Sequence, residues 1–308
     1  VVISASHNPF DDNGIKFFAA TGAKLDDELE ARVEAAVEEP PPAGPVGRVR
    51  ELNGGLEDYL RELESAFPLD LSGRRVALDC ANGATYRAAP AIFERLGASV
   101  EAIGVEPDGR NINAGCGSTH VEALAALVAA GEAEIGFAFD GDGDRVIAVD
   151  ESGSVVDGDR LIALAALALH DAGSLGGGVA VTVMSNYGLR PALAAAGIAV
   201  VETAVGDRHL LEALRDRGWR LGGEQSGHII DMAFVPSGDG IASALLTLES
   251  LGHRRLAAVH PFTPLAQALI AVPVRDRDAV LADSEITAAI AAEEAALAGH
   301  GRVLVRPS

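Results

Sequence analysis

Between residues 56 and 154, the hydrophobic residues follow two patterns that alternate along the chain. Short apolar runs, typical of buried strands, occur at residues 75–79, 99–103, 135–139 and 146–149. Segments whose apolar residues recur every three or four positions predict helices at 82–97 and 119–130. Thr119 and Glu122 have the spacing of a capping box for the second helix. This alternation predicts a largely parallel sheet covered by helices over residues 56–154.

A second stretch of similar length repeats this order. Its apolar runs predict strands at 179–183 and 199–205 and another strand ending at 222–223. Its helical periods lie at 159–171, 188–196, 207–217 and 240–251. Two successive units of similar size and order predict tandem α/β domains, the second over residues 157–256.

The segment before these units resembles the end of another domain. Residues 1–43 begin with the tail of a strand, pass through a polar loop and a turn, and resume as a strand at 15–18. A stripe of apolar residues four apart predicts a helix at 26–39. Three prolines then end the helix and open a linker.

The segment after them predicts an unfinished α+β domain over residues 262–308. It combines a strand at 268–274, a helix at 285–298 and a strand at 301–305. The predicted fold class is therefore α/β, with tandem domains of mixed or parallel sheets followed by a truncated α+β domain.

Three aspartates alternate with glycines between two of the predicted strands. Asp140, Asp142 and Asp144 lie within five residues, and Arg145 follows them. Carboxylates this close repel one another unless a divalent cation lies between them, and carboxylate oxygens are the ligands that Mg²⁺ prefers. The glycines permit the tight turn that brings alternate side chains together. The simpler explanation is a turn rich in Asp and Gly that holds no metal.

A calcium-binding loop is a second interpretation of the same stretch. The EF-hand loop positions one, three, five, eight and twelve fall on Asp140, Asp142, Asp144, Ile147 and Glu151. The sixth position requires glycine and here holds Arg145, and the flanks resemble strands rather than helices. A non-catalytic calcium-binding module at 140–151 is the alternative that does not involve an enzyme.

A hydroxyl group and an imidazole lie side by side near the start of the chain. Residues 4–9 read Ser-Ala-Ser-His-Asn-Pro and follow a strand, so Ser6 is a candidate nucleophile or phosphate carrier next to His7. On its own, this pattern favours an ordinary capped loop. Nearby, Lys16 alternates with apolar neighbours in the next strand and therefore points away from the core.

Two further motifs contain groups suited to sugar phosphates. Residues 222–228 read Gly-Gly-Glu-Gln-Ser-Gly-His, in which Glu224 can accept hydrogen bonds from vicinal hydroxyls and Ser226 can donate or accept them. Asp207 and Arg208 begin a predicted helix, where they could bind a phosphate or simply cap the helix. The chain ends in Arg-Pro-Ser at 306–308.

The composition narrows the possible functions. A formal charge of −21 argues against nucleic-acid binding through a basic face, and no apolar run is long enough to cross a bilayer. The two cysteines, Cys80 and Cys116, lack metal-type spacing and favour a reduced, cytoplasmic setting. Lys16 and Lys24 are the only lysines in the chain, so a lysine near the candidate site is notable.

Together, these motifs resemble those of the α-D-phosphohexomutases over essentially the whole chain. In that family the serine before His-Asn-Pro carries a phosphoryl group, and an Asp-Gly-Asp-Gly-Asp loop holds the Mg²⁺ that contacts it. The resemblance therefore implies a phosphoserine at Ser6 and Mg²⁺ at the three aspartates and the seryl phosphate. Most of the family's first domain and nearly all of its fourth are absent, so we expect little or no turnover from these 308 residues alone.

The details of the motifs favour one branch of the family. Gln225, the Asn-Ile-Asn run at 111–113 and the Thr-Val-Met-Ser-Asn run at 182–186 resemble phosphoglucosamine mutases. This branch interconverts glucosamine 6-phosphate and glucosamine 1-phosphate through a 1,6-bisphosphate, on the way to UDP-N-acetylglucosamine and cell-wall precursors. A phosphomannomutase/phosphoglucomutase is the alternative within the family.

The resemblance also implies roles for the remaining polar residues. The general acid/base is Lys16 or His7, with Lys16 favoured, and Arg145 adds a hydrogen bond to the seryl phosphate. The residues expected to bind the phosphosugar substrate are Glu224, Ser226, His228, Asp207, Arg208, Arg306 and Ser308. A homodimer is a further possibility.

Overall fold

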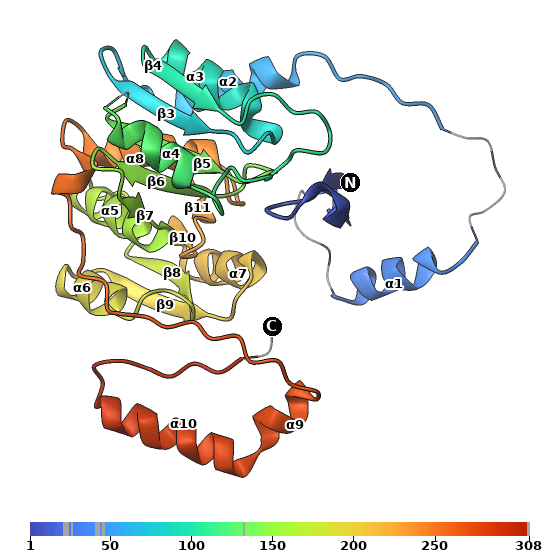
Figure 1. Cartoon of the computed structure of the whole chain (residues 1–308), viewed down its shortest axis with the longest axis vertical. Coiled ribbons are helices and arrows are strands. Elements are labelled where there is room, and N and C mark those ends of the chain that lie inside the picture. The colour runs from blue at the N-terminus through green and yellow to red at the C-terminus, as the bar shows by residue number, and fades with distance from the viewer. Residues whose placement is uncertain (21–24, 26, 41–43, 45–46, 132, 307–308) are drawn as a thin grey trace.

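The computed structural model describes residues 1–20, 25, 27–40, 44, 47–131 and 133–306. Two α/β layers form the centre of the molecule (Figure 1). The N-terminal segment lies beside them, and the C-terminal helices lie below them in this view. This arrangement confirms the predicted class of tandem α/β units with mixed sheets. The exact domain boundaries remain a prediction.

The upper sheet has five strands in the order β4-β3-β5-β6-β7. Its strands are β3 (Arg75–Asp79), β4 (Ser99–Ile103), β5 (Ile135–Phe139), β6 (Val146–Asp150) and β7 (Val155–Val156). β3 pairs in parallel with β4 and β5, whereas β5, β6 and β7 pair antiparallel. The β5–β6 hairpin closes at Phe139 and Val146, so the acidic loop is the turn between two fully buried strands.

The second sheet has four strands in the order β11-β10-β8-β9. Its strands are β8 (Gly178–Thr182), β9 (Ala199–Thr203), β10 (Leu221–Gly223) and β11 (Ile229–Asp231). β8 is parallel to β9 and β10, and β11 returns antiparallel to β10. The motif at 222–228 therefore spans the turn between β10 and β11.

Seven helices in the described part of the chain cover these two sheets. They are α2 (Gly55–Ala66), α3 (Ala88–Arg95), α4 (Glu122–Ala129), α5 (Gly158–Asp171), α6 (Leu189–Ala195), α7 (Asp207–Arg217) and α8 (Gly240–Leu251). Helix α8 contacts β5 and β6 of the first sheet and β11 of the second, and all its residues except Glu249 are buried. One continuous cluster of buried apolar side chains extends from Leu60 to Phe262 through both sheets. The two layers therefore share one core.

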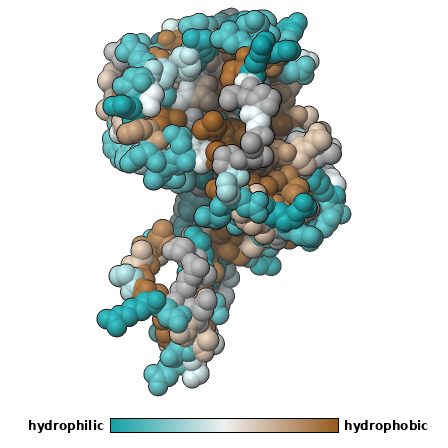
Figure 2. All heavy atoms as spheres, turned by 90° about the vertical axis from the view of Figure 1, so that its right-hand side faces the viewer, coloured by the Kyte–Doolittle hydropathy of each residue, from teal (hydrophilic) through white to brown (hydrophobic). Residues whose placement is uncertain are grey.

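The N-terminal segment packs on this body mainly through polar contacts. It contains β1 (Val2–Ser4), a 3₁₀ turn (Phe10–Asp12), β2 (Gly14–Lys16) and α1 (Asp27–Val37), with β1 and β2 antiparallel. Several of its apolar side chains are exposed, including Ile3 and Ile15. Figure 2, which faces the side on which this segment lies in Figure 1, shows hydrophobic residues exposed among hydrophilic ones.

The C-terminal segment differs from the predicted α+β pattern. It contains α9 (Arg277–Ala282) and α10 (Ser284–Leu297), and the second helix agrees with the prediction at 285–298. The strands predicted at 268–274 and 301–305 are extended chain without a partner strand in the described residues. Apolar alternation favours a strand, but a strand forms only when a neighbour accepts its backbone hydrogen bonds.

Two local predictions need correction, and one helix was missed. Residues 82–97 form a 3₁₀ turn at Ala84–Tyr86 before α3 begins at Ala88. Helix α4 begins at Glu122 with Val121 as a cap that makes no side-chain hydrogen bond, so Thr119 does not cap it. Helix α2 was not predicted, although it buries Leu60 and Leu63.

Both cysteines are free and buried, and none of the described helices meets the length and hydropathy needed to span a membrane.

Candidate active site

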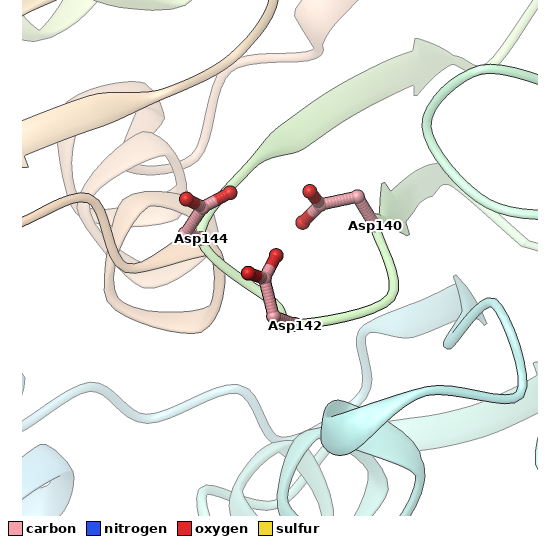
Figure 3. Close-up of side chains that lie close together, drawn as sticks. All are labelled: Asp140, Asp142 and Asp144. Carbon is pink, nitrogen blue, oxygen red and sulfur yellow. The ribbon is translucent and has the colours of Figure 1, made fainter. Parts of the chain in front are cut away.

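The three aspartates of the β5–β6 turn point toward one another (Figure 3). One carboxylate oxygen from each of Asp140, Asp142 and Asp144 lies within 4.8 Å of the others. Asp140 is fully buried, and the other two are partly buried. Gly143 adopts a φ of 75°, a left-handed conformation in which a side chain would be strained, so the turn depends on glycine there.

The donor set of this turn fits a hard divalent cation. Each aspartate has a buried oxygen without a hydrogen-bond partner, namely Asp140 Oδ2, Asp142 Oδ1 and Asp144 Oδ1. Buried acceptors are normally satisfied, so three unsatisfied oxygens in one cluster indicate a group that can hold a cation. Burial and the charges of the other two aspartates raise the pKa of Asp140, which shows how poorly the protein alone accommodates this charge. These residues therefore fit the Mg²⁺ that the sequence predicts.

The loop that contains Ser6 lies against the acidic turn. The backbone N–H of Gly141 donates a hydrogen bond to the carbonyl oxygen of Ser6 at 3.0 Å. Ser4 Oγ donates to Asp142 Oδ2 at 2.7 Å and accepts from the Ser6 N–H at 2.8 Å. Residues more than 130 positions apart in sequence are thus in direct contact.

Ser6 lies next to His7 in a constrained backbone. Its φ of 50° is uncommon for a residue other than glycine, and such conformations concentrate at functional sites. Ser6 Oγ lies 3.3 Å from His7 Nδ1. Burial and the nearby Arg145 guanidinium lower the pKa of His7, which favours a neutral imidazole.

Lys16 reaches the same acidic turn from β2. Its Nζ lies 2.7 Å from Asp142 Oδ2, forming an ion pair. Burial acts to lower the pKa of Lys16, but the hydrogen bond and charge of Asp142, together with Asp144 and Asp140, outweigh it and raise the pKa. In this arrangement Lys16 is an ammonium ion beside the metal ligands.

The acidic turn is also joined to the motif at residues 222–228. Arg145 forms an isolated antiparallel bridge with His228, and Val146 N–H donates to the Gly227 carbonyl at 3.0 Å. His228 Nδ1 lies 3.4 Å from Asp144 Oδ2, and its Nε2 lies 3.8 Å from Asp207 Oδ2. Burial acts to raise the pKa of Asp144, but His228 outweighs it and the pKa is lowered.

Arg145 also lies close to two of the aspartates. Its backbone N–H donates to Asp140 Oδ1 at 3.1 Å, and its Nε is 3.9 Å from Asp140 Oδ2 and 3.8 Å from Asp144 Oδ1. These side-chain separations are too long for hydrogen bonds, and the buried Nε has no partner. The guanidinium N–H therefore remains available for an anion beside the metal position.

Glu224 and Ser226 are neighbours in the β10–β11 turn. Ser226 Oγ donates to Glu224 Oε2 at 3.1 Å, and Gly206 N–H donates to Glu224 Oε1 at 3.3 Å. The side chain of Gln225 turns elsewhere and donates to Asp157 at 3.0 Å and Gln267 at 3.2 Å. Gln225 therefore links the motif to the chain that leads to the C-terminal segment.

The other residues predicted to bind the phosphate of the substrate lie on separate segments of the chain. Asp207 is the first residue of α7, whose cap is Gly206, so the interpretation of Asp207 as a simple N-cap is wrong. Arg208 pairs with Glu212 on the same helix at 3.1 Å. Arg306 is exposed in the chain that follows α10. Ser308 lies outside the described residues.

The calcium-loop interpretation does not fit this geometry. The flanks of the turn are the paired strands β5 and β6, not the two helices of an EF-hand. Glu151, which would supply the last ligand, instead accepts a hydrogen bond from the Ala257 N–H at 3.1 Å. Ile147 is buried in β6. The module proposed for residues 140–151 is therefore wrong.

Two residues with contacts to the Ser6 loop could not be assigned a role from the sequence. Ser4 bridges Ser6 and Asp142, and Asn113 donates hydrogen bonds to two carbonyls of the loop. Both residues lie in motifs that were recognised as distinctive. Their contacts depend on the packing of two distant segments, which residue spacing alone does not reveal.

Comparison with known proteins identifies the family. Three segments match the phosphoglucomutase/phosphomannomutase family: its α/β/α domain I at residues 1–42, domain II at 57–153 and domain III at 157–261. The chain belongs to the phosphoglucomutase/phosphomannomutase family. The resemblance seen in the motifs is thereby confirmed.

Curated members of this family match the whole chain. The phosphoglucosamine mutase of Moorella thermoacetica is 51% identical, and the chain covers 72% of its length. Those of Pelotomaculum thermopropionicum and Rhodococcus jostii are 49% and 47% identical, with 72% and 71% of their lengths covered. The branch of the family favoured by Gln225 and the Asn-Ile-Asn run agrees with these names.

Solved structures of the family share the fold. A phosphoglucomutase/phosphomannomutase family protein from Burkholderia thailandensis has a TM-score of 0.71 and 25% identity, over 82% of this chain and 56% of that one. A putative phosphomannomutase from Thermus thermophilus has a TM-score of 0.70 and 28% identity, over 83% and 60%. An Aspergillus fumigatus N-acetylphosphoglucosamine mutase, solved with GlcNAc-6P and magnesium, has a TM-score of 0.71 at 19% identity, over 90% of this chain and 75% of that one, and supports the fold alone.

Proposed function

We infer that the protein is a phosphoglucosamine mutase that interconverts glucosamine 6-phosphate and glucosamine 1-phosphate. Phosphoglucosamine mutases about half identical over the entire chain support the substrate. The observation that carries the chemistry is the packing of the Ser6 loop against the acidic turn, through Gly141 and Ser4. This contact places a hydroxyl-bearing loop beside a cation site.

In the proposed reaction Ser6 carries a phosphoryl group. A free hydroxyl of the bound sugar phosphate gives its proton to the general base, Lys16 or His7, and its oxygen forms a bond to that phosphorus. The bond from phosphorus to Ser6 Oγ breaks, and Ser6 Oγ takes up a proton. The product is a 1,6-bisphosphate, whose other phosphoryl group then returns to Ser6 Oγ. Each transfer needs charge neutralisation and alignment more than new covalent chemistry.

The residues of the turn provide this neutralisation. Asp140, Asp142 and Asp144 would hold Mg²⁺, which when bound neutralises negative charge on the seryl phosphate. Arg145 Nε makes no hydrogen bond and lies 3.8 Å from Asp144 Oδ1, so it can donate to a phosphate oxygen in the same region. Ser4 keeps Asp142 and the Ser6 backbone in fixed relation through its two hydrogen bonds.

The β10–β11 turn provides groups for the sugar. Glu224 can accept hydrogen bonds from hydroxyls, Ser226 can donate or accept, and His228 is held between Asp144 and Asp207. Asp207, Arg208, Arg306 and Ser308 are proposed to contact the substrate's distal phosphate. Holding the sugar hydroxyl in line with the phosphoryl group can lower the activation free energy by several kcal/mol, on the order of the effect of orienting two reactants.

A substrate comparison tests the proposed function. We expect the protein, at the full length its gene encodes, to turn over glucosamine 1-phosphate at least about tenfold more efficiently than glucose 1-phosphate or mannose 1-phosphate, by kcat/KM. Phosphopeptide mass spectrometry of the same preparation should find phosphate on Ser6. A clear preference for glucose or mannose would assign the protein to the phosphomannomutase/phosphoglucomutase alternative.

The pH dependence of kcat/KM distinguishes the two candidate bases. A lysine base is active only as the neutral amine, and the pKa of Lys16 is raised from 10.5, so its rate limb would still climb at about pH 10. The pKa of His7 is lowered from 6.5, so the midpoint of its limb would lie below about pH 6.5. We expect the alkaline limb and a loss of about 10²–10⁴-fold in kcat for Lys16→Met. A single limb below pH 6.5 that His7→Gln removes would assign the role to His7.

A further inference from the structure

The Asn-Ile-Asn run at 111–113 joins the upper layer to the Ser6 loop through one side chain. Asn113 Nδ2 donates to the Ser6 carbonyl oxygen at 2.8 Å and to the Asn8 carbonyl oxygen at 2.8 Å. A primary amide has two N–H groups, so both donors of Asn113 are used on this loop. The Ser6 loop lies more than 100 residues before Asn113 in the chain.

Asn113 is itself held firmly. Its side chain is 7% exposed, and its backbone N–H donates to the Ala81 carbonyl at 2.9 Å. Its φ of 58° is left-handed, a conformation that asparagine tolerates better than most residues. The carboxylate of Asp79 then fixes the neighbouring turns by accepting from Ala81 N–H at 3.0 Å and Gly117 N–H at 2.7 Å. The amide therefore projects from a rigid loop.

The Ser6 carbonyl is the point where this contact meets the acidic turn. It accepts from Gly141 N–H at 3.0 Å as well as from Asn113. A Cβ on Gly141 would lie 2.4 Å from that carbonyl oxygen and 2.7 Å from Asn113 Nδ2, so the three groups are in close contact. Two donors thus hold the strained backbone of Ser6 directly above the residue between two metal ligands.

We propose that Asn113 is a positioning residue that fixes the phosphate-bearing Ser6 relative to the metal ligands. This role rests on the proposed function, because it concerns the phosphoserine of that reaction. Asn113 acts on the backbone of Ser6 and not on the substrate or the metal. A displacement of about 1 Å at a reacting group costs about 100-fold in rate, which sets the size of the expected effect.

Asn113→Asp tests this role because it preserves shape and removes both donors. Its carboxylate would also face two carbonyl oxygens that need N–H groups. We expect kcat to fall about 100-fold while KM changes less than about threefold. Asn111→Asp is the matched control, since that side chain bonds only within its own loop, to Glu106 and Asp108. The control should keep its activity within about threefold.

Asn113→Gly is a second variant that guards against misfolding. Glycine adopts a φ of 58° without strain, so this change removes the two donors while leaving the backbone conformation accessible. It should reproduce the loss in kcat. Normal kcat in a folded Asn113→Gly protein would overturn the proposal.

A metal titration separates positioning from a general structural role. Mn²⁺ affinity is measured by calorimetry on each protein with Ser6 phosphorylated and dephosphorylated. The dephosphorylated wild type and Asn113→Gly should bind alike, because Asn113 contacts none of the aspartates through a hydrogen bond in the described residues and glycine adds no charge. Phosphorylation should strengthen binding in the wild type, and the gain should be about tenfold smaller in Asn113→Gly. An unchanged gain from phosphorylation would overturn the role of Asn113, whereas a wild type lacking mutase activity and phosphoserine would refute the proposed function itself.

Discussion

Replacing Ser6 by alanine is expected to reduce mutase turnover by at least about 10⁴-fold, to background. The reason is that the reaction needs the Ser6 Oγ as the phosphoryl carrier. Ser4 lies in the same loop, but its Oγ is already committed to Asp142 Oδ2 and the Ser6 N–H. Turnover is measured with glucosamine 6-phosphate on protein at its full natural length.

Fold and metal binding should survive this change. The Ser6 loop is held through backbone carbonyls, by Gly141 and Asn113, and alanine retains both contacts. The control is Ser154→Ala, at an exposed position in the β6–β7 turn, which should keep full activity. Turnover that persists in Ser6→Ala with normal Mn²⁺ binding would remove Ser6 from the role of carrier.

Replacing Asp140 by asparagine should weaken divalent-metal binding and strengthen the metal-free protein. Affinity for Mn²⁺ should fall at least about 100-fold, since even groups that only support metal ligands contribute 10–100-fold. Burial and the two neighbouring carboxylates raise the pKa of Asp140 to about 8, so ionising this group is costly in the metal-free protein, and asparagine removes that cost. We therefore expect the free energy of unfolding without metal to rise by about 1 kcal/mol.

The measurements are Mn²⁺ calorimetry and denaturant unfolding in chelator. Asparagine can keep the Oδ1 that accepts from the Arg145 N–H, so the turn itself should remain intact. Asp171→Asn, at an exposed position near the end of α5, is the control and should change neither quantity. If metal-free Asp140→Asn is less stable than the wild type, repulsion among the aspartates is not what the cation relieves.

Helices with a clear apolar stripe could be predicted closely from the sequence. Helices α7 and α8 begin and end where the pattern places them, at 207–217 and 240–251. Short strands, which form only when a partner strand lies beside them, could not be predicted in the same way. β11 is three residues long and exists because β10 offers it a partner, whereas the apolar run at 268–274 has no partner strand in the described residues and stays extended.

The candidate site shows the same division between local and tertiary information. The alternation of Asp and Gly predicts convergent carboxylates, because a turn of that kind is a local property. Nothing local indicates that Ser4 would bond to Asp142, or that Asn113 would hold the carbonyl of Ser6. Those contacts depend on how a detached N-terminal hairpin packs on a distant sheet.

Helix α8 packs against both sheets and joins them in one hydrophobic core. Because both layers bury side chains against it, the β5–β6 turn and the β10–β11 turn belong to one packed body. The protein cannot exchange the two ends of a bisphosphate by sliding one turn past the other. In the proposed reaction the bisphosphate itself must therefore reorient between the two transfers while it stays bound.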